Sequence, residues 1–257
     1  MAMTMSRTER FSSEGIEIAF IDEGKGEPIL LIHGFGSNMA VNWSLTGWID
    51  SLRKAGRRVV AFDNRGHGQS QKLYEPAAYH PAEMAKDAAN LLAHLGIPQA
   101  DVMGYSMGAR IAAFLALARP ELVRSLIIGG LGMALVDGME GQDEIVAALE
   151  APSLEAVPGD TGRIYRKFAD QTGADLRALA ACMRGSRATI ATAELAAIAA
   201  PTLIAVGSKD KVAGSGEGLA RLIPGAEFLE IPGREHLPAT GDRVFKDAAL
   251  DFLGRRG

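Results

Sequence analysis

Short apolar runs alternate with longer helical patterns along most of the chain, and this alternation limits the possible folds more than any other feature of the sequence. The strand candidates, each bounded by turn residues, are 16–21, 29–32, 58–62, 100–103, 123–128, 202–206 and 227–231. The helical patterns that separate them lie at 43–54, 82–95, 107–118, 219–222 and 244–253. Because such units wind into parallel sheets, we predict an α/β protein with a mostly parallel, doubly wound sheet of about eight strands flanked by helices.

One long stretch interrupts the alternation. From Leu131 to Thr192 there is no strand run, and polar turns at 137–141 and 158–162 separate helical pieces rich in Gly, Pro and Ala. A chain of 257 residues fits a single α/β domain. We therefore expect one core made of residues 1–130 and 193–257, with residues 131–192 inserted as a helical cap of three or four short helices.

The net charge, the first residues and the single cysteine limit the kinds of partner and chemistry that we expect. The formal net charge is −4 without any block of like charges, so nucleic acid and membrane surfaces are not expected partners, and a neutral or mildly cationic small molecule fits better. The polar start Met1–Phe11 lacks the apolar core of a signal peptide, which predicts a cytoplasmic protein. Cys182 lies in an Ala-rich helical stretch, where a buried structural thiol is expected rather than a nucleophile.

The stretch Gly104-Tyr105-Ser106-Met107-Gly108 follows one strand candidate and opens a helix. This is the context of a nucleophile elbow, in which a sharp turn exposes the serine above the sheet. The helix that begins there has free N–H groups, so Met107 N–H is a predicted oxyanion donor. The alternative is a chance match in a chain with 30 glycines, but the strand and helix on either side favour Ser106 as the nucleophile.

A serine nucleophile needs a base and a group that orients the base. His236 follows the last strand candidate, at the end of the sheet where sites of doubly wound folds collect, although a plain surface histidine is the alternative. Asp210 follows the buried strand 202–206 and precedes His236; its alternative is a turn residue. The chain order of Ser106, Asp210 and His236 predicts a catalytic triad.

A second oxyanion donor is expected in the loop after strand 29–32. Here the sequence reads His33-Gly34-Phe35-Gly36, and Phe35 N–H is the candidate donor. Phe35 and Tyr105 are also the predicted substrate-binding residues, with the Phe35 ring forming a wall of the acyl pocket. A phosphate-binding loop is the rival interpretation of this stretch, but Met39 stands where the third glycine of that motif is required.

The loop Asp63-Asn64-Arg65-Gly66-His67-Gly68-Gln69-Ser70 follows another buried strand. We interpret it as structural, with Arg65 or His67 bonded to nearby backbone. The sequence has no Cys cluster and no pair of histidines four residues apart, so no metal and no cofactor are expected.

Taken together, these motifs resemble the α/β-hydrolase superfamily over nearly the whole chain outside the cap. The resemblance rests on the His-Gly-Phe-Gly loop, the Asp-x-Arg-Gly-His-Gly-x-Ser loop, Gly-Tyr-Ser-Met-Gly, Gly-x-x-Asp and a late Glu-His. It implies the α/β-hydrolase fold, with Phe35 in the oxyanion loop, Ser106 as nucleophile, Asp210 as acid and His236 as base. Serine at position 106 argues against the haloalkane dehalogenase and epoxide hydrolase branches, which use aspartate. The chain looks more like small carboxylesterases, lactonases and enol-lactone hydrolases.

These observations predict a serine esterase that cleaves small carboxylic esters or lactones through an acyl-enzyme, with a largely apolar acyl or alcohol group. One alternative is a C–C bond hydrolase or a cofactor-free perhydrolase on the same triad. Another is a non-enzymatic protein that binds a ligand for signalling, since a fold does not fix a function. The expected partner is a small-molecule ester, and the expected state is a monomer or homodimer.

Overall fold

The structure, a computed structural model, describes residues 7–255. Residues 1–6 of the polar start, on which the prediction about a signal peptide partly rests, lie outside the described residues, as do residues 256–257 of the predicted core. The strands are β1 (Glu9–Ser13), β2 (Ile16–Glu23), β3 (Pro28–Ile32), β4 (Arg58–Phe62), β5 (Ala100–Tyr105), β6 (Val123–Gly129), β7 (Thr202–Gly207) and β8 (Glu227–Ile231).

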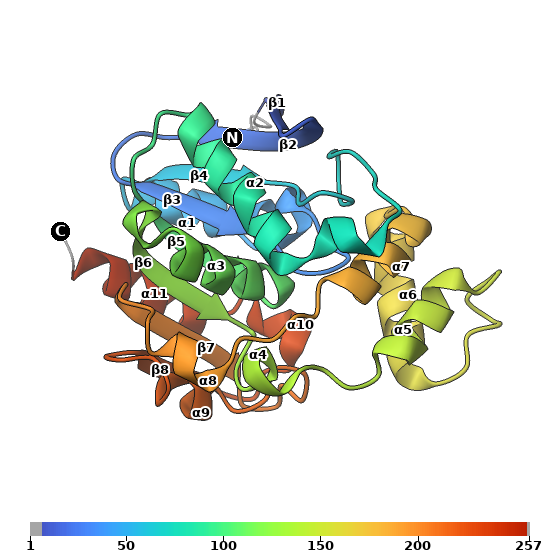
Figure 1. The fold of residues 1–257 in the computed structure, drawn as a ribbon. Helices are drawn as coiled ribbons and strands as arrows, with labels where there is room; N and C mark the ends of the chain where they lie inside the picture. The colour runs from blue at the N-terminus through green and yellow to red at the C-terminus, as the bar shows by residue number, and fades with distance from the viewer. Residues whose placement is uncertain (1–6, 256–257) are drawn as a thin grey trace.

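Within residues 7–255 these strands form one eight-stranded sheet in the order β1-β2-β4-β3-β5-β6-β7-β8 (Figure 1). Strand β2 is antiparallel to both β1 and β4, and the remaining pairs are parallel. The predicted mostly parallel sheet is therefore confirmed. Strand β1 was not among the sequence-based candidates because Glu9–Ser13 is largely polar; it forms a hairpin with β2 through Glu14 and Gly15, whose φ angles are 50° and 88°.

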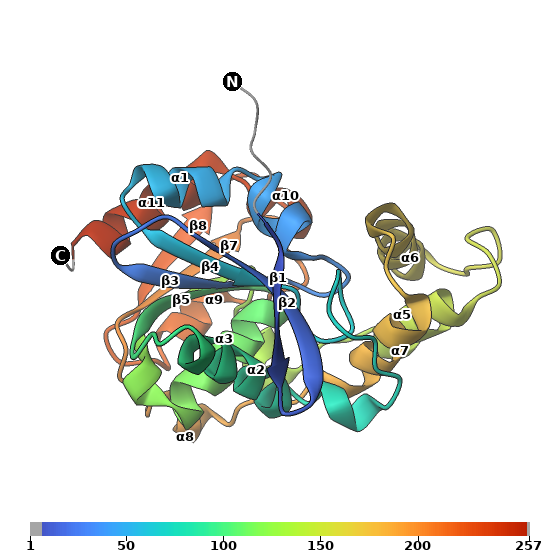
Figure 2. The same ribbon diagram turned by 90° about the horizontal axis from the view of Figure 1, so that it is seen from above.

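Helices cover both faces of the sheet (Figure 2). The helices outside the stretch between β6 and β7 are α1 (Trp48–Lys54), α2 (Pro81–His94), α3 (Met107–Ala118), α9 (Gly216–Ala220), α10 (His236–Ala239) and α11 (Arg243–Gly254), with the π-helical turn η1 (Ala40–Ser44) and the 3₁₀ turns η2 (Pro76–Tyr79) and η3 (Pro120–Leu122). Alternate residues of β3 enter different clusters: Leu30 and Ile32 pack on the face of α2 and α3, and Leu31 packs with Trp48 on the other face. This two-sided burial explains the continuous apolar runs of the central strands.

Two predicted helices have different bounds in the structure. The pattern 43–54 is divided into η1 and α1, because Gly47 has a φ of 77° and interrupts the helix. Helix α9 begins three residues before the predicted 219–222, since the Ser215 side chain accepts a hydrogen bond from Gly218 N–H at 2.9 Å and caps the helix there. None of the helices within residues 7–255 combines the length and the apolar character needed to cross a membrane.

The stretch between β6 and β7, residues 130–201, is called the helical insertion below. It contains α4 (Ala134–Asp137), α5 (Gln142–Glu150), α6 (Asp160–Thr172), α7 (Leu176–Gly185) and α8 (Thr192–Leu195). Figures 1 and 2 both show α5, α6 and α7 standing apart from the sheet, beyond the carboxyl ends of its parallel strands. The predicted cap, residues 131–192, lies within this stretch.

One core side chain holds both ends of the helical insertion. Arg110 of α3 donates hydrogen bonds to Ala134 O at 2.8 Å, where the insertion leaves the core, and to Ala188 O at 2.7 Å, where it returns. The two crossing segments also bond to each other, because Ile190 N–H donates to Leu135 O at 3.1 Å. The base of the insertion is thus fixed to the helix that follows Ser106.

Candidate active site

Ser106 occupies the turn between β5 and α3 with φ 54° and ψ −113°. Among the described residues other than glycine, only Glu14 also has a positive φ. Such a conformation is costly and persists only where the surroundings impose it. Here α3 lies so close to β3 that a Cβ on Gly108 would come within 1.9 Å of Ile32 O. The predicted sharp turn with a glycine at position 108 therefore follows from the close contact of helix and sheet.

A chain of hydrogen bonds joins the three predicted triad residues. His236 Nε2 lies 2.9 Å from Ser106 Oγ, and His236 Nδ1 lies 2.7 Å from Asp210 Oδ2. The other carboxylate oxygen, Oδ1, accepts from the N–H groups of Val212 at 2.9 Å and Ala213 at 3.0 Å. A carboxylate only accepts, so Nδ1 carries the imidazole proton and Nε2 is left to accept from the serine hydroxyl. The Asp210 side chain is fully buried, and that of His236 is 14% exposed.

Two aromatic side chains hold the segment that carries His236. Tyr105 OH donates to His236 O, and Trp48 Nε1–H donates to Thr240 O at 2.7 Å. Tyr105 is 3% exposed, and its ring centroid lies 5.7 Å from that of His236. The structure therefore does not place Tyr105 at the surface of the pocket, where the sequence-based prediction had it bind substrate. Its buried ring and bonded hydroxyl make it a residue that positions the histidine segment.

The two predicted oxyanion donors lie on either side of Ser106. Met107 is the first residue of α3, so its N–H has no acceptor within the helix. Phe35 follows Gly34, and a Cβ on Gly34 would come within 3.5 Å of the Ser106 Cβ, which places the loop against the serine. Among the described residues, no hydrogen-bond acceptor is found for Phe35 N–H. Both groups are available to an oxygen bound beside Ser106.

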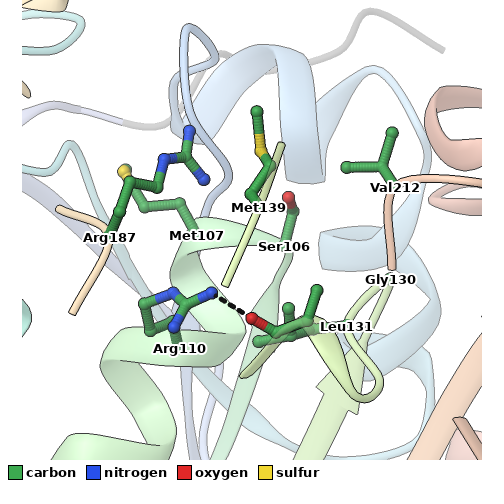
Figure 3. A pocket seen from close by; sticks show the side chains of 9 residues that line it. Ser106, Met107, Arg110, Gly130, Leu131, Met139, Arg187 and Val212 are labelled. Carbon is green, nitrogen blue, oxygen red and sulfur yellow. Dashed lines mark hydrogen bonds between the residues drawn. The ribbon is translucent and has the colours of Figure 1, made fainter. Parts of the chain in front are cut away.

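A narrow pocket, partly open to solvent, lies over Ser106 (Figure 3). Its lining includes Ser106, Met107 and Arg110 of the core, Leu131, Met139 and Arg187 of the helical insertion, and Val212 of the Asp210 loop. Figure 3 shows the guanidinium groups of Arg110 and Arg187 on one side of Ser106 and Val212 on the other. The two arginines are functional candidates that the sequence analysis missed, although one lone charge within the apolar helix 107–118 was a visible signal.

Phe35 is not among the residues that line this pocket. Its ring lies beneath Arg187, with 5.5 Å between the guanidinium carbon and the ring centroid, and 6.1 Å from the ring of Tyr165. The structure thus places the ring behind Arg187, as a support for that side chain, and not as the predicted wall of the acyl pocket.

The loop 63–70 has no hydrogen bond to Ser106, Asp210 or His236 among residues 7–255, and its polar groups bond within the loop and to neighbouring segments. Asp63 accepts hydrogen bonds from Met39 N–H at 2.8 Å and from Gln69 N–H at 2.7 Å, and burial raises the pKa of its carboxyl group. Arg65 forms a buried ion pair with Asp87 at 2.7 Å and donates to Ala78 O at 2.8 Å. This loop therefore links β4 to the oxyanion loop and to α2.

Two of the remaining histidines are buried near this loop. His33 Nε2 accepts from Asn64 N–H at 2.9 Å, and burial lowers the pKa of His33 to about 4. Burial, with the nearby His33, lowers the pKa of His67 to about 3. Both rings are therefore neutral at pH 7. His80 caps α2 by accepting from Ala82 N–H, and the exposed His94 stacks on Phe11.

Cys182 is fully buried, and burial raises the pKa of its thiol to about 12, as suits a structural residue. Within residues 7–255, no three His, Cys, Asp or Glu side chains are grouped so that they could hold a metal ion.

Comparisons with known proteins agree with this fold and site. A sequence profile of the family described as alpha/beta hydrolase fold matches residues 27–149. The chain is 30% identical to RutD of Variovorax paradoxus (strain S110), provisionally named a carbamate hydrolase, over 90% of this chain and 92% of that one. It is 27% identical to a non-heme haloperoxidase of Rhodococcus erythropolis over 88% and 91% of the two chains. A thermophilic esterase from Thermogutta terrifontis, solved with malate bound, has a TM-score of 0.79 at 26% identity, covering 97% of this chain and 99% of that one.

The chain therefore belongs to the alpha/beta hydrolase fold family, as its motifs predicted. The three relatives carry the names of different activities. Membership thus leaves the reaction and the substrate to be argued from the site itself.

Proposed function

We propose that the chain is a serine hydrolase that cleaves small carboxylic esters or lactones through an acyl-enzyme. The observation that carries this proposal is the continuous hydrogen-bond chain from Asp210 through His236 to Ser106. Serine is a weak nucleophile until an adjacent base removes its proton, and the base needs a third group to fix its tautomer. This arrangement meets both needs.

In the first half of the reaction, Ser106 Oγ attacks the carbonyl carbon while its proton passes to His236 Nε2. Asp210 stabilises the resulting imidazolium through Nδ1–H, and the N–H groups of Phe35 and Met107 donate to the carbonyl oxygen as it becomes negative. His236 then gives the proton to the leaving alcohol oxygen. Water attacks the acyl-enzyme, with His236 again as base, and the acid is released with Ser106 restored.

The helical insertion has the role of a cap in this proposal. Met139 and Arg187 come from it and share the pocket with Ser106, so the insertion contributes to the choice of substrate. The chemistry uses no cofactor. We place the reaction in the cytoplasm, with a small-molecule ester as the partner and a monomer or homodimer as the working state.

The test is hydrolysis of p-nitrophenyl esters from acetate to decanoate by the wild type and by Ser106→Ala, His236→Ala and Asp210→Ala. By analogy with triad proteases, we expect losses in kcat on the order of 10⁶-fold for the first two and about 10⁴-fold for Asp210→Ala. Unchanged thermal unfolding of each variant serves as the control for folding.

Substantial activity remaining in Ser106→Ala would remove the proposal. If the wild type is inert towards esters but cleaves a β-diketone or forms peracids in a Ser106-dependent way, the C–C hydrolase or perhydrolase alternative replaces it. Tight ligand binding without turnover would indicate the non-enzymatic alternative.

A further inference from the structure

Arg187 and Arg110 are the two buried or half-buried arginines that have no carboxylate partner among residues 7–255, and only Arg187 also lacks an oxygen acceptor. Among residues 7–255, its only hydrogen-bond acceptor is the sulfur of Met183, which lies 3.2 Å from Nε and 3.0 Å from one terminal nitrogen. A thioether is a weak acceptor and carries no charge. No carboxylate of the described residues pairs with Arg187, and the charged group near it in the same pocket is a second cation, Arg110.

Arg110, the second arginine of the pocket, is not available to a ligand in the same way. Its guanidinium group donates to three main-chain carbonyls, those of Ala134, Leu135 and Ala188. These bonds fix the base of the helical insertion and leave the positive charge itself uncompensated. The pocket therefore combines a free guanidinium with a second, fixed cation, and burial lowers the pKa of both groups without supplying an anion.

A half-buried guanidinium is costly to leave unpaired, because its lost hydration is not replaced by an opposite charge. Its support is nevertheless well built: the Phe35 ring lies under its face and Met183 fixes its edge. Arg187 and Ser106 line the same pocket (Figure 3). An anion in this pocket would be bound within reach of the nucleophile.

We propose that Arg187 binds a carboxylate of the substrate, so that the preferred substrates are short esters that carry a free acid group. The inference rests on the proposed serine hydrolase function. It replaces the neutral or mildly cationic substrate expected from the net charge and the largely apolar acyl or alcohol group predicted with it. The planar guanidinium matches a carboxylate with two parallel hydrogen bonds, which orients the ligand as well as holding it.

The first experiment compares p-nitrophenyl hydrogen succinate and glutarate with their methyl-capped diesters, which have the same leaving group and nearly the same size. We expect the wild type to have the higher kcat/KM on the free acids. Arg187→Gln should lower kcat/KM for the free acids by about 10- to 100-fold, the range for one charged hydrogen-bonding group. The ratio of acid to capped ester should then fall to about 1. Arg187→Lys, which keeps the charge but loses the planar fork, should keep part of the preference.

The matched control is Arg184→Gln, which removes a positive charge three residues away. Arg184 pairs with Glu150 at 2.8 Å on the outside of the insertion and does not line the pocket, so its variant should keep the wild-type ratio. A second pair of substrates, O-acetyl glycolate and its methyl ester, places the acid group on the alcohol side. A preference for the free acid among the succinate and glutarate esters would place the carboxylate in the acyl group of the substrate. A preference for O-acetyl glycolate over its methyl ester would place it in the alcohol.

The second experiment needs no turnover. Calorimetric titration of monomethyl glutarate into Ser106→Ala should detect binding, and the same titration into Ser106→Ala combined with Arg187→Gln should show it weakened at least about tenfold. If esters are cleaved by Ser106 but neither acid is preferred, or the preference survives Arg187→Gln, the inference fails and the proposed function stands. If no ester is cleaved while Arg187-dependent binding persists, the proposed function fails and the carboxylate site stands. If neither ester cleavage nor Arg187-dependent binding is found, the proposed function and the carboxylate site both fail.

Discussion

The α/β core and the helical insertion differ in how they neutralise buried charge. In the core, Arg65 pairs with Asp87 at 2.7 Å, and both side chains are almost fully buried. In the insertion, Arg166 pairs with an Asp170 that is 43% exposed, and Arg187 has no carboxylate partner among residues 7–255. The Arg65–Asp87 pair is therefore neutralised within the core, where Arg110 is the exception because it bonds only to main-chain carbonyls. Arg187 of the insertion presents a charge that a molecule from outside the chain can satisfy.

The two regions also divide the proposed work. Ser106 and Asp210 lie in the loops that follow β5 and β7, and His236 opens α10 after β8, all in the core, while Arg187 lies in the insertion. A change at Ser106, Asp210 or His236 should lower the rate of hydrolysis by the same factor for every substrate. A change at Arg187 should alter the ratio between substrates. The predictions that follow test this division.

The largest effect is expected for Asp210→Asn, a core change that keeps size and shape. Asp210 Oδ1 accepts from two backbone N–H groups, so the amide oxygen of asparagine would take that position and its NH₂ would face His236 Nδ1. The imidazole would then hold its proton on Nε2 and could not accept from Ser106. We expect kcat to fall about 10⁴-fold, by the same factor on acidic and capped esters.

Asp247→Asn, at an exposed aspartate paired with Arg243, is the matched control and should keep wild-type rates. A loss in Asp210→Asn that depended strongly on the acid group of the substrate would contradict the division between core chemistry and insertion selectivity.

Most of the core and all of the triad were predictable from the sequence because the signals are local. The central strands are buried on both faces, so they read as apolar runs, and Ser106 and Asp210 each follow such a run. His236 follows the edge strand β8, a shorter and mostly exposed run that its place late in the alternation still identified. The edge strand β1 was not predicted because Phe11 is its only large apolar residue. Helix 43–54 was wrong at Gly47, where a single left-handed residue ends the pattern.

The presence of Arg187 in the pocket over Ser106 was not predictable in the same way. Arg187 lies 81 residues from Ser106 in the chain, and nothing in Gly185-Ser186-Arg187 indicates that the side chain enters the pocket of a distant serine. That Arg187 lacks a carboxylate partner is evident only from the residues that surround it in the folded chain. The same holds for Tyr105, which flanks the nucleophile in sequence yet faces away from the pocket to hold His236.

The second comparison sets Arg65→Ala of the core against Arg166→Ala of the insertion. Removing Arg65 leaves the buried Asp87 without its counter-charge, which should lower the free energy of unfolding by about 3–5 kcal/mol. Removing Arg166 leaves a solvated Asp170 and two carbonyls, which should cost about 1–2 kcal/mol. Guanidinium chloride unfolding measures both. Equal losses would show that the two regions do not differ as described.

The last prediction concerns acid stability, which should be a property of the core because the five histidines, at positions 33, 67, 80, 94 and 236, lie outside the insertion. The folded pKa values of His33 and His67, about 4 and about 3, lie below the usual value of 6.5. The unfolded chain therefore binds protons first, and stability is full above pH 6.5 and falls below it. Each histidine should cost about 1.4 kcal/mol per pH unit, or about 2 kcal/mol between pH 7 and 5.

Urea unfolding at pH 7 and pH 5 checks this slope. His67→Gln should remove about half of the pH dependence, and the exposed His94→Gln should leave it unchanged. Asp63 acts in the opposite direction, since its raised pKa lets the folded protein take up a proton first and offsets part of the loss at the acid end. If the dependence of the free energy of unfolding on pH is unchanged in His67→Gln, groups other than His67 cause the loss of stability in acid.

The bonds that hold the histidine segment end on the main chain: Tyr105 donates to His236 O and Trp48 donates to Thr240 O. A carbonyl is present whatever side chain a residue carries. The exposed residues 237 and 238 are therefore free to diverge in sequence while the imidazole stays in place. The buried Ala239 is not, nor are Tyr105 and Trp48, far away along the chain. Among homologues, we expect identity to persist at the two donors and variation to gather in the segment that they hold.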